Sequence, residues 1–135
     1  MLYHFYFILF STFTLGGDFI IYREMIVWQK AMELVKEVYL LVKKLPKKET
    51  CALSDQMRRA AVSIPSNIAE GYGRKSKADY CRFLDISRGS LYELETQIEI
   101  AIMLDFFKPE DTEKFRSLSQ EVGKMLNSLI SKLEK

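Results

Sequence analysis

Apolar residues recur every three or four positions in four separate segments of the chain, which is the period of an amphipathic helix. The first segment spans residues 26–45. One apolar row in it consists of Trp28, Ala31, Met32, Val35, Val38, Tyr39, Val42 and Leu45, and a second row recurs every seven residues at Val27, Leu34 and Leu41. Since two adjacent rows make a wide apolar surface, we expect this helix to contact more than one neighbour.

The width of this surface also predicts that the chain associates with copies of itself, because one bundle does not easily bury both rows. We expect the interface between subunits to include Val27, Trp28, Leu34, Tyr39 and Leu41. Large aromatic residues often anchor interfaces. Trp28 and Tyr39 suit ordinary core positions equally well.

The other three segments repeat the helical pattern. We expect the second helix to begin near Thr50, the third at Ser76, whose hydroxyl is placed to cap it, and the fourth at about Pro109. Their inward residues are expected to be Leu53, Met57, Ala60, Ala61, Ile64 and Ile68 in the second, Tyr80, Leu84, Ser87, Leu91, Leu94, Ile98 and Ala101 in the third, and Phe115, Leu118, Val122, Met125, Leu126, Leu129 and Leu133 in the fourth. The sequence therefore predicts an all-α fold, an antiparallel up-down-up-down four-helix bundle.

Pro65 lies inside the second predicted helix, where proline removes one backbone hydrogen bond and pushes against the carbonyl of Ala61, at about 3 kcal/mol. Because core spacing continues across it, we predict a kink rather than a loop. Asn67 is expected to bond the freed carbonyl or an adjacent helix. After Glu70, Gly71 is expected to end the helix in the left-handed conformation. A packed kink explains this motif, and a ligand site is the alternative.

Composition indicates one domain with a distinct N-terminal extension. The 135 residues are 48% hydrophobic and 28% charged, which is enough for a core without disulfides or metals. Residues 1–17 are apolar and aromatic without Lys or Arg, so we expect the bundle to occupy residues 18–135. The extension is predicted to be disordered or a non-native start. A signal peptide or anchor is the alternative, although a basic n-region is missing and a membrane span needs ~20 residues.

The residue types that carry catalysis are scarce. His4 is the only histidine, and Cys51 and Cys81 are far apart in the sequence. The predicted bundle therefore contains no Ser-His or Cys-His pair and no set of ligands for structural zinc. The glutamates within residues 93–99 lack the histidines that di-metal bundles use. We predict a protein without enzymatic activity, cofactor or metal, with free thiols in a reducing cytoplasm.

Charge is unevenly distributed, although the formal net charge is only +2. Cations dominate residues 58–88, and carboxylates dominate residues 89–113. The predicted nucleic-acid-binding residues are Arg58, Arg59, Arg74, Lys75, Lys77, Arg82 and Arg88. Tyr72 and Tyr80 lie among them and are expected to stack on unpaired bases of RNA or single-stranded nucleic acid.

A second class of function, protein interaction, also explains this charge distribution. Arg58 or Arg59 then pairs with an acidic residue such as Glu70 or Glu95, and the basic and acidic faces meet each other or a protein partner. The chain is in that case an interaction adaptor or scaffold without direct contact to nucleic acid.

Three blocks of sequence carry a family resemblance: VWQKAMELV (residues 27–35), QMRRAAVSIPSNIAEGYGR (residues 56–74) and YCRFLDISRGSLYELETQI (residues 80–98). In this order they resemble the four-helix-bundle proteins encoded by intervening sequences of bacterial large-subunit rRNA genes. The resemblance implies a homopentameric ring and no enzymatic activity. It also implies kinship with the accessory variability proteins of diversity-generating retroelements, which bind a reverse transcriptase and nucleic acid.

Overall fold

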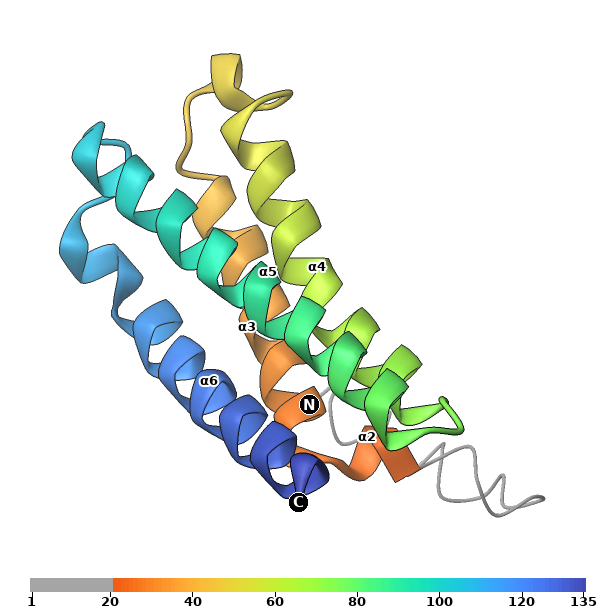
Figure 1. Ribbon diagram of the computed structural model, residues 1–135. Coiled ribbons are helices and arrows are strands. Elements are labelled where there is room, and N and C mark those ends of the chain that lie inside the picture. Colours follow the sequence, from red (N-terminus) through yellow and green to blue (C-terminus); the bar gives the residue numbers. More distant parts are fainter. Residues whose placement is uncertain (1–20) are drawn as a thin grey trace, which may run out of the picture.

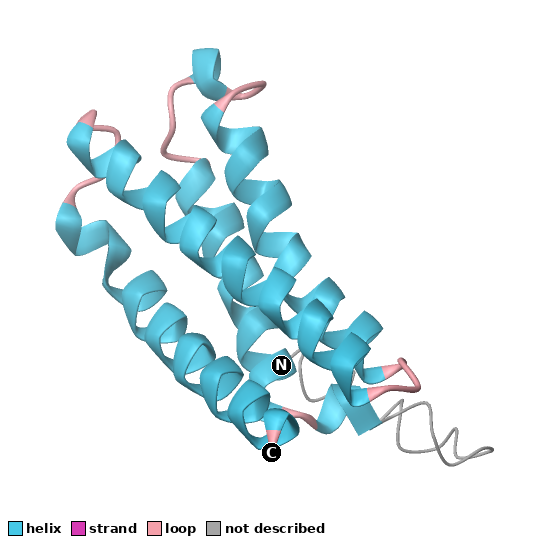
Figure 2. Ribbon diagram, viewed as in Figure 1, coloured by secondary structure: helices cyan, strands magenta, loops and turns pink. Residues whose placement is uncertain are grey.

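The computed structural model describes residues 21–135, in which all regular elements are helical (Figure 2). The elements are α2 (Ile21–Glu24), α3 (Ile26–Val42), η1 (Lys47–Glu49), α4 (Leu53–Tyr72), α5 (Lys77–Met103), η2 (Pro109–Thr112) and α6 (Glu113–Glu134). The all-α fold class is confirmed for this part of the chain. The predicted extension, residues 1–17, lies outside the described residues.

The four long helices lie side by side, with α3 and α5 each packed against both α4 and α6. Figure 1 shows that α3 joins α4, and α5 joins α6, at one end of the molecule, whereas α4 joins α5 at the other. Along the contact between α3 and α6, Lys30 pairs with Glu121 at 3.2 Å and Glu37 with Lys114 at 4.0 Å. Residue numbers rise on α3 as they fall on α6, so these two helices run antiparallel.

The apolar rows of α4, α5 and α6 point inward as their spacing predicts. The residues among them that are at most 1% exposed include Met57, Ala61, Ile64, Ile68, Leu84, Leu91, Leu94, Ile98, Val122 and Leu126. They form one continuous core with the inward row of α3. Burial of a large aliphatic side chain is worth roughly 1.5–3 kcal/mol, so this core is the main source of stability.

The inward row of α3 differs from the expectation. Val27, Leu34 and Leu41 are 5%, 0% and 2% exposed, while Met32 and Tyr39 face outward at 41% and 43%. The expectation that Val27, Leu34 and Leu41 contact another subunit is therefore corrected, because their own chain already encloses them. Of the first apolar row, Met32 and Tyr39 are left at the surface, while Ala31, Val38, Val42 and Leu45 are buried as well.

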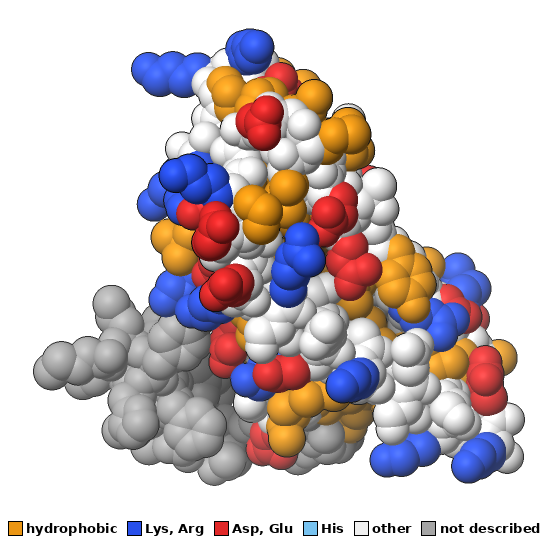
Figure 3. Space-filling model, turned by 90° about the vertical axis from the view of Figure 1, so that its left-hand side faces the viewer, with side chains coloured by type: hydrophobic (Ala, Val, Ile, Leu, Met, Phe, Trp, Pro, Cys, Tyr) orange, Lys and Arg blue, Asp and Glu red, His pale blue; other side chains and the backbone are white. Residues whose placement is uncertain are grey.

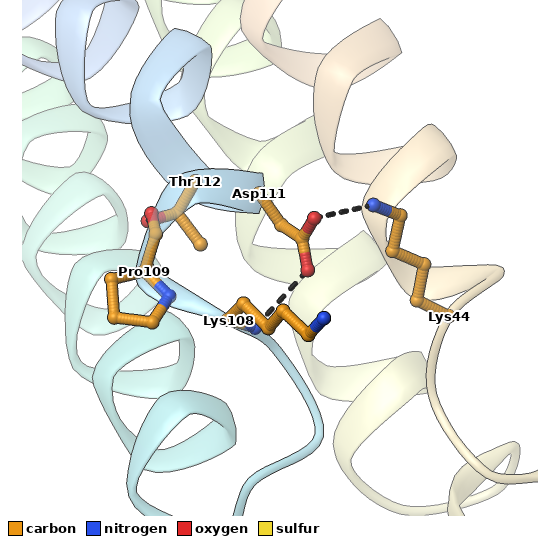
Figure 4. Close-up of polar contacts among 5 residues, drawn as sticks. All are labelled: Lys44, Lys108, Pro109, Asp111 and Thr112. Carbon is orange, nitrogen blue, oxygen red and sulfur yellow. Dashed lines mark hydrogen bonds and ion pairs between the residues drawn. The ribbon is translucent and has the colours of Figure 1, made fainter.

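Asp111 fixes the start of the last helix against the end of α3 (Figure 4). One of its carboxylate oxygens accepts a hydrogen bond from Lys44 Nζ at 2.8 Å, and the other accepts one from the Lys108 backbone N–H at 3.1 Å. The Thr112 hydroxyl donates to the Pro109 carbonyl at 2.8 Å. The bond from Lys44, and then the bond from Lys108, hold the pKa of Asp111 below its usual value.

Helix α4 continues through Pro65. Asn67 Nδ2 donates to the Ser63 carbonyl at 2.8 Å and to Ser63 Oγ at 2.9 Å. Asn67 thus bonds Ser63 and not the Ala61 carbonyl that the proline frees, which corrects the first of the two expected roles. Ser63 Oγ in turn shares a 2.8 Å hydrogen bond with Ser90 Oγ of α5, so Asn67 reaches the adjacent helix through Ser63.

Gly71 lies inside α4, and Gly73 occupies the C-cap with a φ of −76°. The predicted left-handed helix end at Gly71 is wrong, since its φ lies outside that region. A Cβ at Gly71 would come within 2.8 Å of the Phe83 Cβ and 2.9 Å of Tyr80 Cδ2. Glycine is required there because α5 approaches too closely for any side chain. The neighbouring Glu70 is exposed.

Candidate nucleic-acid interface

The connection between α4 and α5 is a tight turn at one end of the molecule (Figure 1). Backbone bonds close the end of α4, where the Gly73 N–H donates to the Ala69 carbonyl at 3.3 Å. The Ser76 hydroxyl accepts a hydrogen bond from the Asp79 N–H at 3.1 Å and caps α5, as its sequence position predicts. The two residues between these caps, Arg74 and Lys75, belong to neither helix, and both are exposed.

Four cations of the predicted patch gather at this connection: Arg74, Lys75, Lys77 and Arg82, here called the basic turn. All four are exposed. Among the described residues, no carboxylate lies within 4.0 Å of Arg74, Lys75 or Lys77. Arg82 has one carboxylate partner in the described part of the chain, Asp79 of its own helix, at 3.7 Å. The basic turn therefore presents positive charge that its surroundings leave largely uncompensated.

An aromatic ring holds two members of the basic turn in place. The guanidinium carbons of Arg74 and Arg82 lie 4.5 Å and 5.0 Å from the centroid of the Phe83 ring. Phe83 is itself only 7% exposed, so it provides a fixed support. Cation–π contact at such distances orients both guanidinium groups without neutralising their charge.

The remaining predicted arginines lie apart from the basic turn and are bonded within the protein. Arg58 Nη2 donates to the Thr50 carbonyl at 3.4 Å, and Arg59 pairs with Asp55 at 3.1 Å, so neither pairs with Glu70 or Glu95. Arg88 pairs with Asp85 at 2.8 Å and also donates to Asn127 at 3.0 Å. At a rise of 1.5 Å per residue, Arg58 lies about 24 Å along α4 from Arg74. The structure thus brings together four of the seven predicted cations.

The two tyrosines predicted to stack on bases pack against each other instead. Their rings meet edge to face, with centroids 6.2 Å apart and planes at 87°. Tyr80 packs on the core, and its hydroxyl donates to the Met25 sulfur at 3.8 Å. Burial raises the pKa of Tyr80 to about 12. Tyr80 is therefore poorly placed as a stacking platform, whereas Tyr72 is half-buried at the edge of the basic turn.

The predicted acidic surface is broken up by cations and hydroxyls from neighbouring elements. Glu99 pairs with Arg116 at 2.8 Å, and Glu95 accepts a short hydrogen bond from the Ser119 hydroxyl. Figure 3 shows the result on one face, where acidic and basic side chains alternate with isolated hydrophobic groups. Within residues 21–135, no cluster of His, Cys, Asp or Glu is arranged to hold a metal ion. The thiols of Cys51 and Cys81 are free.

An apolar groove runs along the outer contact of α3 and α4 and encloses about 370 Å³. Its lining residues are Tyr22, Trp28, Met32, Val35, Val62, Pro65, Ser66 and Ala69. Val62 is 42% exposed. Val62 was not among the residues predicted from the sequence, although it is apolar and directly follows Ala61 of the inward row of α4. None of the described helices is long and apolar enough to cross a bilayer.

Comparison with known proteins identifies a family and similar solved structures. The model of the family named 23S rRNA-intervening sequence protein matches residues 23–128. The chain is also similar to a crystal structure from Bacteroides thetaiotaomicron, described as a protein with unknown function from the S23 ribosomal protein family. The two are 29% identical with a TM-score of 0.72, over 78% of this chain and 98% of that one. A comparison with curated proteins finds no match.

Proposed function

The chain belongs to the 23S rRNA-intervening sequence protein family, and we propose that it is a non-enzymatic homo-oligomer that binds RNA or single-stranded nucleic acid through phosphate contacts at the basic turn. The observation that carries this proposal is the set of three exposed cations, Arg74, Lys75 and Lys77, without carboxylate partners among residues 21–135. Free cations at one end of a rigid bundle are suited to phosphate groups.

Assembly places several copies of this weak binding site in one oligomer. In the proposed homopentamer, five antiparallel four-helix bundles, each bent at Pro65, present five basic turns to one nucleic-acid strand. Each additional contact is then intramolecular, so weak single contacts add up to firm binding. Phosphate contacts carry little sequence information, and binding is therefore expected to depend on salt far more than on sequence. The setting is a cytoplasm in which Cys51 and Cys81 remain reduced.

A charge-matched pair of variants tests the basic turn. Arg74→Ala/Lys75→Ala/Lys77→Ala removes the three unpaired cations, while the control Lys43→Ala/Lys47→Ala/Lys48→Ala removes three exposed lysines at the opposite end of the bundle. We expect the first variant to bind single-stranded RNA at least tenfold more weakly at low salt, measured by fluorescence anisotropy. The control is expected to lose less than threefold, because a positive net charge alone does not position phosphates.

Equal losses in the two variants would show that net charge, not the basic turn, governs binding. Unchanged affinity for RNA in both variants would contradict the proposed nucleic-acid binding. In that event the second candidate stands, a scaffold that binds a protein such as a reverse transcriptase-like partner. The apolar groove between α3 and α4 favours this second candidate, since an exposed hydrophobic groove is a common docking site for protein segments.

A further inference from the structure

Two exposed apolar surfaces of this chain lie on different helices. The first is the groove between α3 and α4, whose outward residues include Met32 and Val62, at 41% and 42% exposed. The second is the outward face of α5, where Ile86 and Tyr92 are 43% and 52% exposed. Because α5 packs mainly on α4 and α6, its outward face lies across the bundle from α3. One molecule can therefore use both surfaces at once.

Gly89 lies between Ile86 and Tyr92, three residues from each, and its own chain gives no reason for a glycine. A Cβ added there would meet no atom within 4 Å, in contrast to the crowded position of Gly71. Glycine in a helix interior weakens the helix relative to alanine. A bare backbone at an exposed position is useful where another helix approaches from outside. Gly89 thus leaves open space on the outward face of α5, where a helix of another molecule has room to approach.

The two surfaces match in length. Ile86 and Tyr92 are separated by about 9 Å along α5, and the α3 residues that line the groove extend over about 10 Å, from Trp28 to Val35, at 1.5 Å per residue. The small residues Ser66 and Ala69 and the ring of Pro65 line the α4 side of the groove, so a helix can settle deeply against it.

The charges at the edges of the two surfaces are opposite. Arg59, one turn from Val62 on α4, has a side chain that is 80% exposed. Glu93 follows Tyr92 on α5 and is also exposed. In the present contacts Arg59 pairs with Asp55 of its own helix, and Glu93 accepts a hydrogen bond from Gln97. Both side chains remain exposed to solvent. In an Arg59–Glu93 ion pair between two copies, Arg59 would contact a carboxylate and Glu93 would accept a hydrogen bond, as each does within its own helix.

We propose that the occupant of the groove is a second copy of this chain, whose α5 inserts its Gly89 face between α3 and α4 of the first. This inference rests on the proposed homo-oligomer and names the two surfaces that build it. The contact is heterologous, because each copy offers its groove to one neighbour and its α5 to another. Repetition of such a contact closes a ring when the rotation permits.

Complementary variants test this directly. Met32→Glu/Val62→Glu blocks the groove and keeps the α5 face, while Ile86→Glu/Tyr92→Glu blocks the α5 face and keeps the groove. All four side chains are more than 40% exposed, so both variants are expected to fold, which circular dichroism checks. Light scattering is expected to give a monomer for each variant alone. An equimolar mixture is expected to give a dimer of one copy of each, because one intact groove then meets one intact α5.

The outcomes separate this inference from the function proposed above. A mixture that stays monomeric, or a single variant that keeps the wild-type mass, overturns the groove–α5 contact while the oligomer stands. A wild-type protein that is monomeric at micromolar concentration overturns the oligomer itself. Trp28, the single tryptophan of the chain, lines the groove, so its fluorescence provides a second measurement of the contact. Its emission in the Ile86→Glu/Tyr92→Glu variant is expected to shift to the blue only when the groove variant, carrying Trp28→Phe, is added.

Gly89→Ala provides an independent check that does not introduce charge. In the Met32→Glu/Val62→Glu background, where assembly is absent, the added methyl group is expected to raise the thermal midpoint. In the otherwise wild-type chain it is expected to weaken assembly at least fivefold. A higher midpoint with undiminished assembly would show that no neighbouring copy approaches Gly89.

Discussion

At the scale of single residues, one glycine of α4 and one of α6 differ in how closely a neighbouring helix approaches them. Gly71 faces the Phe83 Cβ at a distance that leaves no room for a methyl group, and Gly123 of α6 would place a Cβ 3.5 Å from the Leu91 side chain, an ordinary contact. Sequence alone marks both as weak points of a helix. Only the packing distinguishes a glycine that a neighbour requires from one that alanine replaces without strain.

Substitution of these two glycines makes this distinction measurable. Gly71→Ala is expected to destabilise the bundle by about 1–3 kcal/mol, because α4 and α5 have to separate to admit the methyl group. The matched variant Gly123→Ala is expected to be neutral or to stabilise by up to about 1 kcal/mol, through helix propensity. Urea denaturation gives both values. Equal effects of the two variants would mean that α5 does not approach Gly71 as closely as described.

At the scale of helices, the sequence predicted α4, α5 and α6 better than α3. In each of the three, one apolar row is set off by polar residues, so the inward side is unambiguous. In α3 two adjacent rows are apolar, and hydrophobicity does not decide between them. Polar residues decide between them. Lys30 and Glu37, seven residues apart on α3, pair with Glu121 and Lys114 of α6. Lys44, seven residues further along and just beyond α3, pairs with Asp111 of η2. These polar residues identify the inward side of α3 only when it is already known that α6 packs against it.

The contact between Asp111 and α3 predicts a pH dependence of stability. The folded-state pKa of Asp111 lies below its usual value of 3.8, so this carboxylate stabilises the fold above that pH and loses its contribution as the pH falls through the folded-state pKa. Asp111→Asn is therefore expected to lower the thermal midpoint at pH 6 and to have little effect near pH 2.

Glu110→Gln is the matched control, since the exposed Glu110 side chain has no ion pair among residues 21–135. It is expected to leave the midpoint nearly unchanged at both pH values. A deficit of Asp111→Asn that is as large at pH 2 as at pH 6 would exclude the ionised carboxylate as its cause.

At the scale of the whole molecule, the grouping of the candidate nucleic-acid-binding cations was predicted only in part. The sequence located a concentration of cations, and the structure groups four of them because the α4–α5 turn folds two sequence segments together. Arg58, Arg59 and Arg88 were included on proximity in sequence alone, yet helix rise carries the first two far from the turn. The partners of Arg59 and Arg88 lie three or four residues away on their own helices, a spacing that the sequence already displayed.

The salt dependence of RNA binding tests the central claim most directly. If three phosphate contacts per engaged subunit come from Arg74, Lys75 and Lys77, each contact to a single strand contributes roughly 0.7 to the slope of log affinity against log salt concentration. Replacement of the three cations by alanine should therefore reduce that slope by about 2 for each engaged subunit. The account predicts this smaller slope for the basic-turn variant and the wild-type slope for the variant at Lys43, Lys47 and Lys48. Identical slopes for the wild-type protein and the basic-turn variant would contradict it.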